Sequence, residues 1–112
     1  HGEVRVLAVQ MLGRLGDERM VPAYERMLTN TPIELRLAAA EALARLGDAG
    51  QALPVLLEGA EMELATARAQ AAFALALVPD RAAAAMLETL LDDPEEIVRV
   101  AAAAAMLRAI DA

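Results

Sequence analysis

The sequence lacks several residue types that enzymes use as nucleophiles, bases or metal ligands. Its 112 residues include no cysteine, serine, lysine or tryptophan, and the only histidine is His1. These absences exclude a serine or cysteine nucleophile, a Schiff-base lysine, a thiolate or histidine-cluster metal site, and a histidine general base within the fold. We therefore predict a protein without catalytic activity, with no cofactor and no metal site.

Long apolar runs and aromatic residues are also scarce. Aromatic residues make up 2% of the chain, and the longest uncharged stretch is 69–79, between Arg68 and Asp80. A bilayer span needs about 20 apolar residues, and the first residues show no signal-peptide pattern. The sequence therefore predicts no membrane span and favours a cytoplasmic location.

Small residues and good helix formers dominate what remains. Hydrophobic residues make up 58% of the chain, and 28 residues are alanine. Because β-branched and aromatic residues are few, this composition predicts an all-α protein. The net charge of -7 is expected to steer the protein toward another protein with a basic surface and away from nucleic acid.

The chain contains an internal repeat that is visible in its arginines and aspartates. Four arginines are separated by 31, 32 and 31 residues, and an aspartate follows each of them twelve positions later. Such fixed spacing is typical of repeat architectures. The repeated residues are Arg5, Arg36, Arg68 and Arg99, followed by Asp17, Asp48, Asp80 and Asp111.

Each repeat predicts a pair of helices. Apolar residues recur at positions -1, +3, +6, +7 and +10 from each arginine, which is the spacing of one helix face. Glycine or proline precedes each of the first three repeated aspartates and suits a helix end, whereas the aspartate suits the N-cap of a second helix. Gln51, three residues after Asp48, is placed to complete a capping box. In the first repeat this predicted core stripe is Val4, Ala8, Met11, Leu12 and Leu15.

These pairs predict an α-solenoid, because two helices of this length cannot bury their apolar faces alone. We expect one domain over residues 1–112, with repeats near 3–32, 33–62 and 63–94 and a partial repeat at 95–112. This makes about 3.5 helix pairs. The seven predicted helices lie near residues 3–15, 19–28, 33–46, 50–60, 63–77, 81–91 and 95–110.

The segments 3–28 and 33–60 resemble HEAT repeats of the short bacterial type first noted in phycobilisome lyase subunits. The third copy departs from the pattern with Pro79 in place of the glycine at Gly47. The resemblance implies a protein-binding scaffold whose helices with the repeated arginines line the concave face. Two enzyme classes with HEAT-like repeats do not fit. DNA glycosylases need a basic groove, whereas this chain has ten arginines and seventeen acidic residues. Deoxyhypusine hydroxylases bind iron through histidines, and the only histidine here is His1.

We predict that the concave face is a partner-binding surface, with Phe73 as an isolated aromatic hot spot. Two other interpretations stay open, namely that adjacent helices cover this face or that copies of the chain self-associate through it. The repeated arginines are expected to bond carboxylates or helix-end carbonyls of the next repeat. The predicted partner-binding residues are Val6, Gln10, Leu37, Glu41, Phe73, Val100 and Ala104.

The sequence therefore predicts a non-catalytic scaffold that binds a partner protein. The alternative is a structural or oligomerisation domain excised from a larger multidomain protein. A chromophore-lyase-type subunit is a less favoured alternative that rests on the resemblance alone. The helix expected at 95–110 carries an uncharged run from Val100 to Leu107, unlike the polar outer face of a capping repeat. This run predicts either a fragment of a longer solenoid or ends that pack on another copy. The acidic residues at 92–96 are attributed to a helix start rather than to a cation site.

Overall fold

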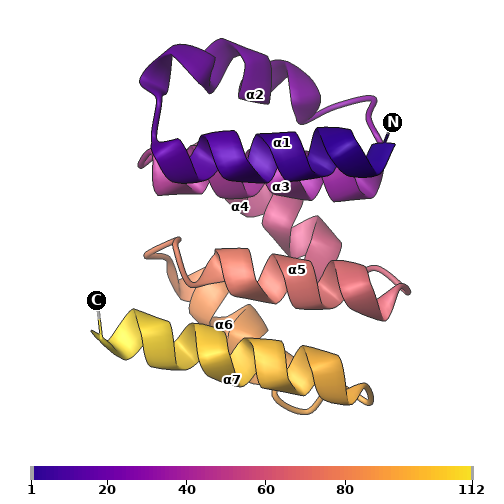
Figure 1. Ribbon diagram of the computed structural model, residues 1–112. Helices are drawn as coiled ribbons and strands as arrows, with labels where there is room; N and C mark the ends of the chain where they lie inside the picture. Colours follow the sequence, from indigo (N-terminus) through magenta and orange to yellow (C-terminus); the bar gives the residue numbers. More distant parts are fainter. Residues whose placement is uncertain (1, 112) are drawn as a thin grey trace.

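A computed structural model describes residues 2–111 of the chain, and the side chains of residues 2–110. All regular structure in this part is helical, which confirms the predicted all-α solenoid (Figure 1). Each predicted helix boundary lies within two residues of the observed one. The elements are α1 (Gly2–Leu15), a 3-10 turn (Glu18–Met20) leading into α2 (Val21–Met27), α3 (Ile33–Arg45), α4 (Ala49–Ala60), α5 (Ala65–Leu75), α6 (Arg81–Leu90) and α7 (Glu96–Asp111).

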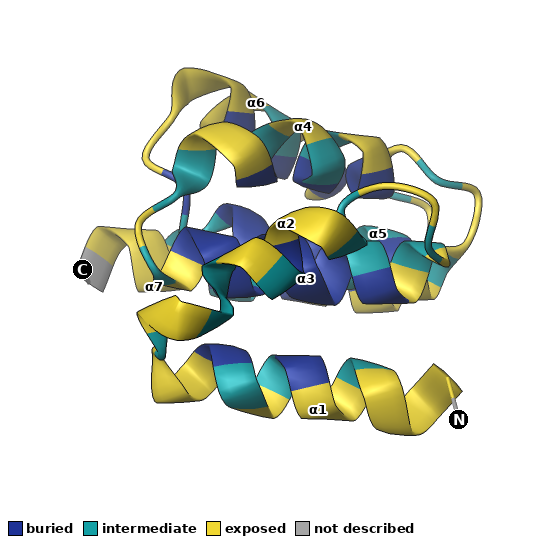
Figure 2. Ribbon diagram, turned by 90° about the horizontal axis from the view of Figure 1, so that it is seen from above, coloured by how far each residue is buried: buried dark blue, intermediate teal, exposed yellow. Residues whose placement is uncertain are grey.

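The helices α3, α5 and α7 form one layer, and α1 lies on one side of it, packed on α3, while α5 packs on α7 (Figure 2). We call α1, α3, α5 and α7, which carry the repeated arginines, the inner helices. The helices α4 and α6 cover the other side of this layer (Figure 2). None of the helices within residues 2–111 is long and apolar enough to cross a bilayer.

Local residues explain where the helices start and stop. Gly16 and Gly47 have positive φ angles of 70° and 88°, which glycine adopts without steric penalty at a helix C-terminus. The Asp17 carboxylate accepts a hydrogen bond from the Arg19 backbone N–H at 3.0 Å. The Asp80 carboxylate accepts one from the Ala82 N–H at 2.7 Å. The predicted aspartate caps are therefore confirmed at these two positions.

The capping box predicted at Asp48 is wrong. The backbone of Asp48 (φ -94°, ψ 64°) lies outside the extended region that Asp17 and Asp80 adopt, and its side chain caps no backbone N–H. Instead, the Asp48 carboxylate accepts a hydrogen bond from Gln51 Nε2 at 2.7 Å, and the same amide donates to Glu25. The side chain of Asp111, the fourth predicted cap, lies outside the described residues.

The core is centred on α3, which is buried on most of its circumference. Alanines at 38–40 and at 42 and 44 let neighbouring helices approach closely, and Leu43 fills the space between the layers. The predicted core stripe is buried in α5 and over the first three turns of α7. Small side chains in the stripe thus set the stacking distance of the inner helices.

The predicted core stripe is wrong for α1. Val4, Met11 and Leu15 are exposed, as is Ala8, and Leu12 is only half-buried. The reason is that α1 packs on α3 through the opposite face: a Cβ added at Gly13 would lie 2.8 Å from the Ala42 Cβ. The short helix α2 packs on α3 rather than over α1, so most of α1 is exposed (Figure 2).

Candidate functional site

A groove lies among the four inner helices. It has a volume of about 530 Å³ and is open to solvent. All four inner helices contribute to its walls, so the groove exists only because the repeats stack. The lining residues are Gln10, Arg14, Glu41, Arg45, Ala69, Gln70, Phe73 and Arg108.

Two repeated sequence positions produce most of this lining. The fifth residue after each repeated arginine gives Gln10, Glu41 and Phe73. The ninth gives Arg14, Arg45 and Arg108, each in the last turn of its helix. Equivalent positions of stacked repeats occupy equivalent places on their helices, which explains why residues about 31 positions apart line one groove.

The groove carries positive charge although the chain as a whole is acidic. Arg45 forms an ion pair with Glu41 at 3.0 Å, one helical turn away. Arg14 and Arg108 are exposed, and neither has an ion-pair partner among the residues that the structure describes. Three arginines and one glutamate leave a local charge of +2 (3 - 1), against -7 for the whole chain.

Phe73 supplies the aromatic surface of the groove. Phe73 is 44% exposed and lies on α5, which packs against both α3 and α7. Gln70, one turn before it, hydrogen-bonds the Glu34 carbonyl at 3.4 Å and so connects α5 to α3. The site therefore combines one ring with amide and guanidinium donors.

Comparison with known proteins assigns the fold to a family. The family model described as HEAT repeats matches residues 1–66, more than half of the chain. The chain belongs to the HEAT-repeat family. No curated protein matches it. HEAT repeats generally mediate protein–protein interaction, and the family is typically a non-enzymatic scaffold.

The structure brings together only part of the predicted partner-binding surface of this HEAT-repeat chain. Gln10, Glu41 and Phe73 line the groove. Val100 is exposed and Ala104 is half-buried, but neither lines it. Val6 is half-buried at a separate cavity of about 440 Å³ between the first turns of α1 and α3.

The predicted accessibility of Leu37 is wrong. Leu37 is fully buried, because α3 lies between α1 on one side and α4 and α5 on the other. Its side chain packs against Gly59 of α4, next to Ala71 of α5. The equivalent position faces outward only in α7, where it is Val100.

The groove arginines are residues that the sequence analysis missed. An arginine stands nine positions after the repeated arginine in three of the four copies, and Leu77 occupies the position in the remaining copy. The recurrence is present in the sequence, but it is less regular than the column of Arg5, Arg36, Arg68 and Arg99, which lies on a different face of the same helices.

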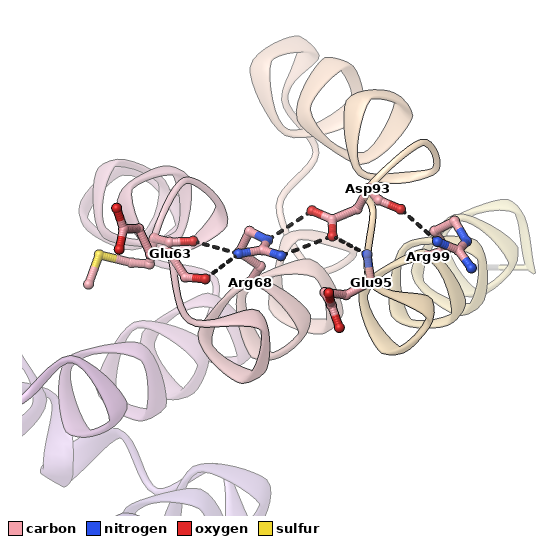
Figure 3. Close-up of polar contacts among 6 residues, drawn as sticks. Glu63, Arg68, Asp93, Glu95 and Arg99 are labelled. Carbon is pink, nitrogen blue, oxygen red and sulfur yellow. Dashed lines mark hydrogen bonds and ion pairs between the residues drawn. The ribbon is translucent and has the colours of Figure 1, made fainter.

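Arg68 connects the two loops that flank its own helix pair (Figure 3). Its guanidinium binds the Asp93 carboxylate through two hydrogen bonds of 2.8 and 3.0 Å. It also donates to the carbonyls of Met62 and Glu63, at 2.9 and 2.7 Å. Asp93 in addition accepts a hydrogen bond from the Glu95 N–H. These contacts hold the guanidinium in place, so Arg68 is a structural residue.

The charges of this cluster stabilise each other. The Arg68 guanidinium, aided by the Glu95 backbone N–H, holds the pKa of Asp93 below its ordinary value of 3.8. The hydrogen bond with Asp93 raises the pKa of Arg68. Arg99 donates to the Asp93 carbonyl at 2.8 Å, which attaches α7 to the same loop.

The other repeated arginines make weaker contacts. Arg36 lies 3.6 Å from the Glu58 carboxylate, and its buried Nε has no hydrogen-bond partner among the described residues. Arg5 is exposed at the edge of the cavity near Val6. The prediction that these arginines bond groups of the next repeat is wrong for Arg36 and Arg68. Arg36 lies near Glu58 of its own repeat. Arg68 bonds Asp93 of its own repeat and the carbonyls of the loop that precedes its helix.

The described residues contain no group of three histidine, aspartate or glutamate side chains placed to hold a metal ion. Within the groove, Glu41 is the only acidic side chain, and Arg45 neutralises it. What the groove offers is guanidinium and amide donors around an aromatic ring, a set that binds carboxylates and apolar side chains.

Proposed function

We propose that this HEAT-repeat chain is a non-catalytic scaffold that binds a partner protein on its concave face, in the groove across α1, α3, α5 and α7. The observation that carries the proposal is the half-exposed ring of Phe73 among donors from all four inner helices. Interfaces commonly place an aromatic anchor at their centre and polar groups around it. The groove has this arrangement.

The local charge favours an acidic partner segment. The net charge of -7 predicts basic partners for the surface as a whole. Salt screens charges beyond about 8 Å at physiological ionic strength, so a segment lying in the groove interacts mainly with the side chains that line it. Arg14 and Arg108 then meet carboxylates of the partner, while Phe73 contacts an apolar side chain.

The test begins with a peptide library displayed against the immobilised chain. The selected peptides should be rich in aspartate and glutamate. Their affinity is then measured by fluorescence anisotropy for the chain and for the double variant Arg14→Glu/Arg108→Glu, which changes the groove charge from +2 to -2. We expect the double variant to bind about 30-fold more weakly, which corresponds to roughly 2 kcal/mol.

The matched control is Arg81→Glu, which reverses an exposed arginine on α6, outside the groove. This variant has the same type of substitution and should bind within about twofold of the original chain, since exposed charges outside an interface change affinity little. Selection of basic peptides, or equal affinity for the double variant and the original chain, would contradict the proposal.

A further inference from the structure

The groove holds more hydrogen-bond donors than its own carboxylate can occupy. Arg45 donates to Glu41 through Nε and Nη2, at 3.2 and 3.0 Å, and both bonds go to the same oxygen, Oε2. Among the described residues, Arg45 Nη1 and the guanidinium groups of Arg14 and Arg108 make no hydrogen bond. Each guanidinium has five N–H donors. An anion of the partner would therefore find many donors in the groove.

The ion pair on α3 orders one of these donors. The Glu41 side chain is 14% exposed and that of Arg45 29%, so both are partly enclosed by the groove. A side chain that is already held in place loses less conformational freedom when it binds a ligand. Arg45 is thus the ordered donor of the groove. Arg14 and Arg108 are exposed and supply the local charge of +2, because Glu41 neutralises Arg45.

The groove is too small for a long run of acidic side chains. Its volume of about 530 Å³ lies within the range of about 300–1,000 Å³ that is typical of sites for one small molecule. A segment that also places an apolar side chain against Phe73 has room there for few further side chains. The segment therefore has to carry its negative charge on one or two of them.

A phosphoryl group fits this donor set better than a single carboxylate. A carboxylate has two oxygens, and one guanidinium occupies both in a bidentate pair. A phosphorylated serine or threonine has three acceptor oxygens and a charge of about -1.5 to -2 at pH 7, which matches the +2 of the groove. One such side chain can accept hydrogen bonds from two guanidinium groups at once. Arginine clusters are a recurring means of recognising phosphorylated segments.

We propose that the segment bound in this groove carries a phosphorylated serine or threonine, whose phosphoryl oxygens accept hydrogen bonds from Arg14 and Arg108, with Arg45 as the ordered third donor. The inference rests on the proposed binding of an acidic segment. It adds that phosphorylation of the partner switches the binding on, because an unmodified serine brings no charge to the guanidinium groups. An apolar residue next to the phosphorylated one contacts the ring of Phe73, which is half-exposed.

Short peptides in matched triplets test the inference. The members of a triplet have the same sequence except at the centre, which is serine, glutamate or phosphoserine, and the triplets differ in the apolar residues beside it. Fluorescence anisotropy measures the affinity of the chain for each member. The phosphoserine member should bind about tenfold more tightly than the glutamate member, because it forms additional charged hydrogen bonds. The serine member should bind most weakly.

A variant that keeps the charge tests the role of the guanidinium groups. The double variant Arg14→Lys/Arg108→Lys retains the local charge of +2, but an ammonium group is a point charge that cannot form a bidentate pair. We expect it to bind glutamate peptides within about threefold of the original chain and to lose most of the preference for phosphoserine. The matched control Arg81→Lys, at an exposed site on α6 outside the groove, should retain the preference.

The outcomes separate this inference from the proposed function. Circular dichroism establishes that the variants retain their helix content. Glutamate peptides that bind as tightly as their phosphoserine counterparts would overturn the inference and leave the proposed function in place. A preference for phosphoserine that the folded lysine variant keeps would also overturn it, because the two arginines would then not be its source. If neither anionic peptide binds more tightly than the serine peptide, the proposed function fails as well.

Discussion

Replacing Gly13 with alanine tests the closest approach between two inner helices. The added Cβ would lie 2.8 Å from the Ala42 Cβ and 3.1 Å from the Ala42 Cα, whereas carbon atoms in contact are normally about 3.5–4.0 Å apart. The atoms in the way include backbone, so α1 has to move away from α3. Overpacking of this kind costs about 1–3 kcal/mol.

Helix propensity acts in the opposite direction. Alanine is favoured over glycine by about 1 kcal/mol inside a helix. The net effect expected for Gly13→Ala is therefore a loss of about 1 kcal/mol in the free energy of unfolding. The matched substitution is Gly50→Ala in α4, where the added Cβ has no atom within 4 Å. Only the propensity gain applies there, so Gly50→Ala should stabilise the protein by about 0.5–1 kcal/mol.

Thermal unfolding followed by circular dichroism measures the difference. The two variants should differ by about 2 kcal/mol, or about 8 °C in Tm for a domain of this size. Gly13→Ala should have the lower Tm and Gly50→Ala the higher one. If both variants were equally stabilised, α1 and α3 would lie farther apart than described, and the account of inner-helix packing would be refuted.

Three further predictions concern stability. Arg68→Ala should lower the free energy of unfolding in urea by about 2 kcal/mol, because the half-buried Asp93 carboxylate loses its partner; an unchanged value would show that this cluster is not structural. Arg68 lowers the pKa of Asp93, so the stabilisation is present above the unfolded value near 3.8 and is lost as the pH falls through the lower folded pKa. Asp93→Asn should therefore flatten the pH dependence of unfolding below about pH 4, and an undiminished slope would count against the ion pair. Tyr24 is fully buried, and its hydroxyl has no hydrogen-bond partner among the described residues. Tyr24→Phe should raise the free energy of unfolding by about 1 kcal/mol, and a destabilised variant would reveal an unrecognised partner of the hydroxyl.

The helices and their order were predictable because the repeat period and the helix face recur together. The same period predicted that Gln10, Glu41 and Phe73 share one side of the stack. What the sequence could not show is which face of an end helix is covered. The helix α1 is apolar on two sides, and only its packing on α3 through Gly13 decides that Met11 is exposed.

Composition alone could not predict the charge of the groove either. A total of -7 says nothing of where the few arginines lie. Arg14, Arg45 and Arg108 line one groove because each lies in the last turn of an inner helix at the same repeat position. Leu37 shows the reverse case, in which a position predicted to face a partner is covered by α4 and α5. The charge of the groove and the burial of Leu37 both depend on how neighbouring helices pack. The repeat pattern of a single helix does not specify that packing.

The central claim is that the groove around Phe73 binds an acidic protein segment. Phe73 is the only phenylalanine of the chain, so labelling with 4-fluorophenylalanine gives one fluorine NMR resonance from the groove itself. Titration with a selected acidic peptide should shift this resonance in a saturable way, and the same peptide with asparagine and glutamine in place of its acidic residues should leave it nearly unchanged. An acidic peptide that binds the chain without moving the Phe73 resonance would contradict the account.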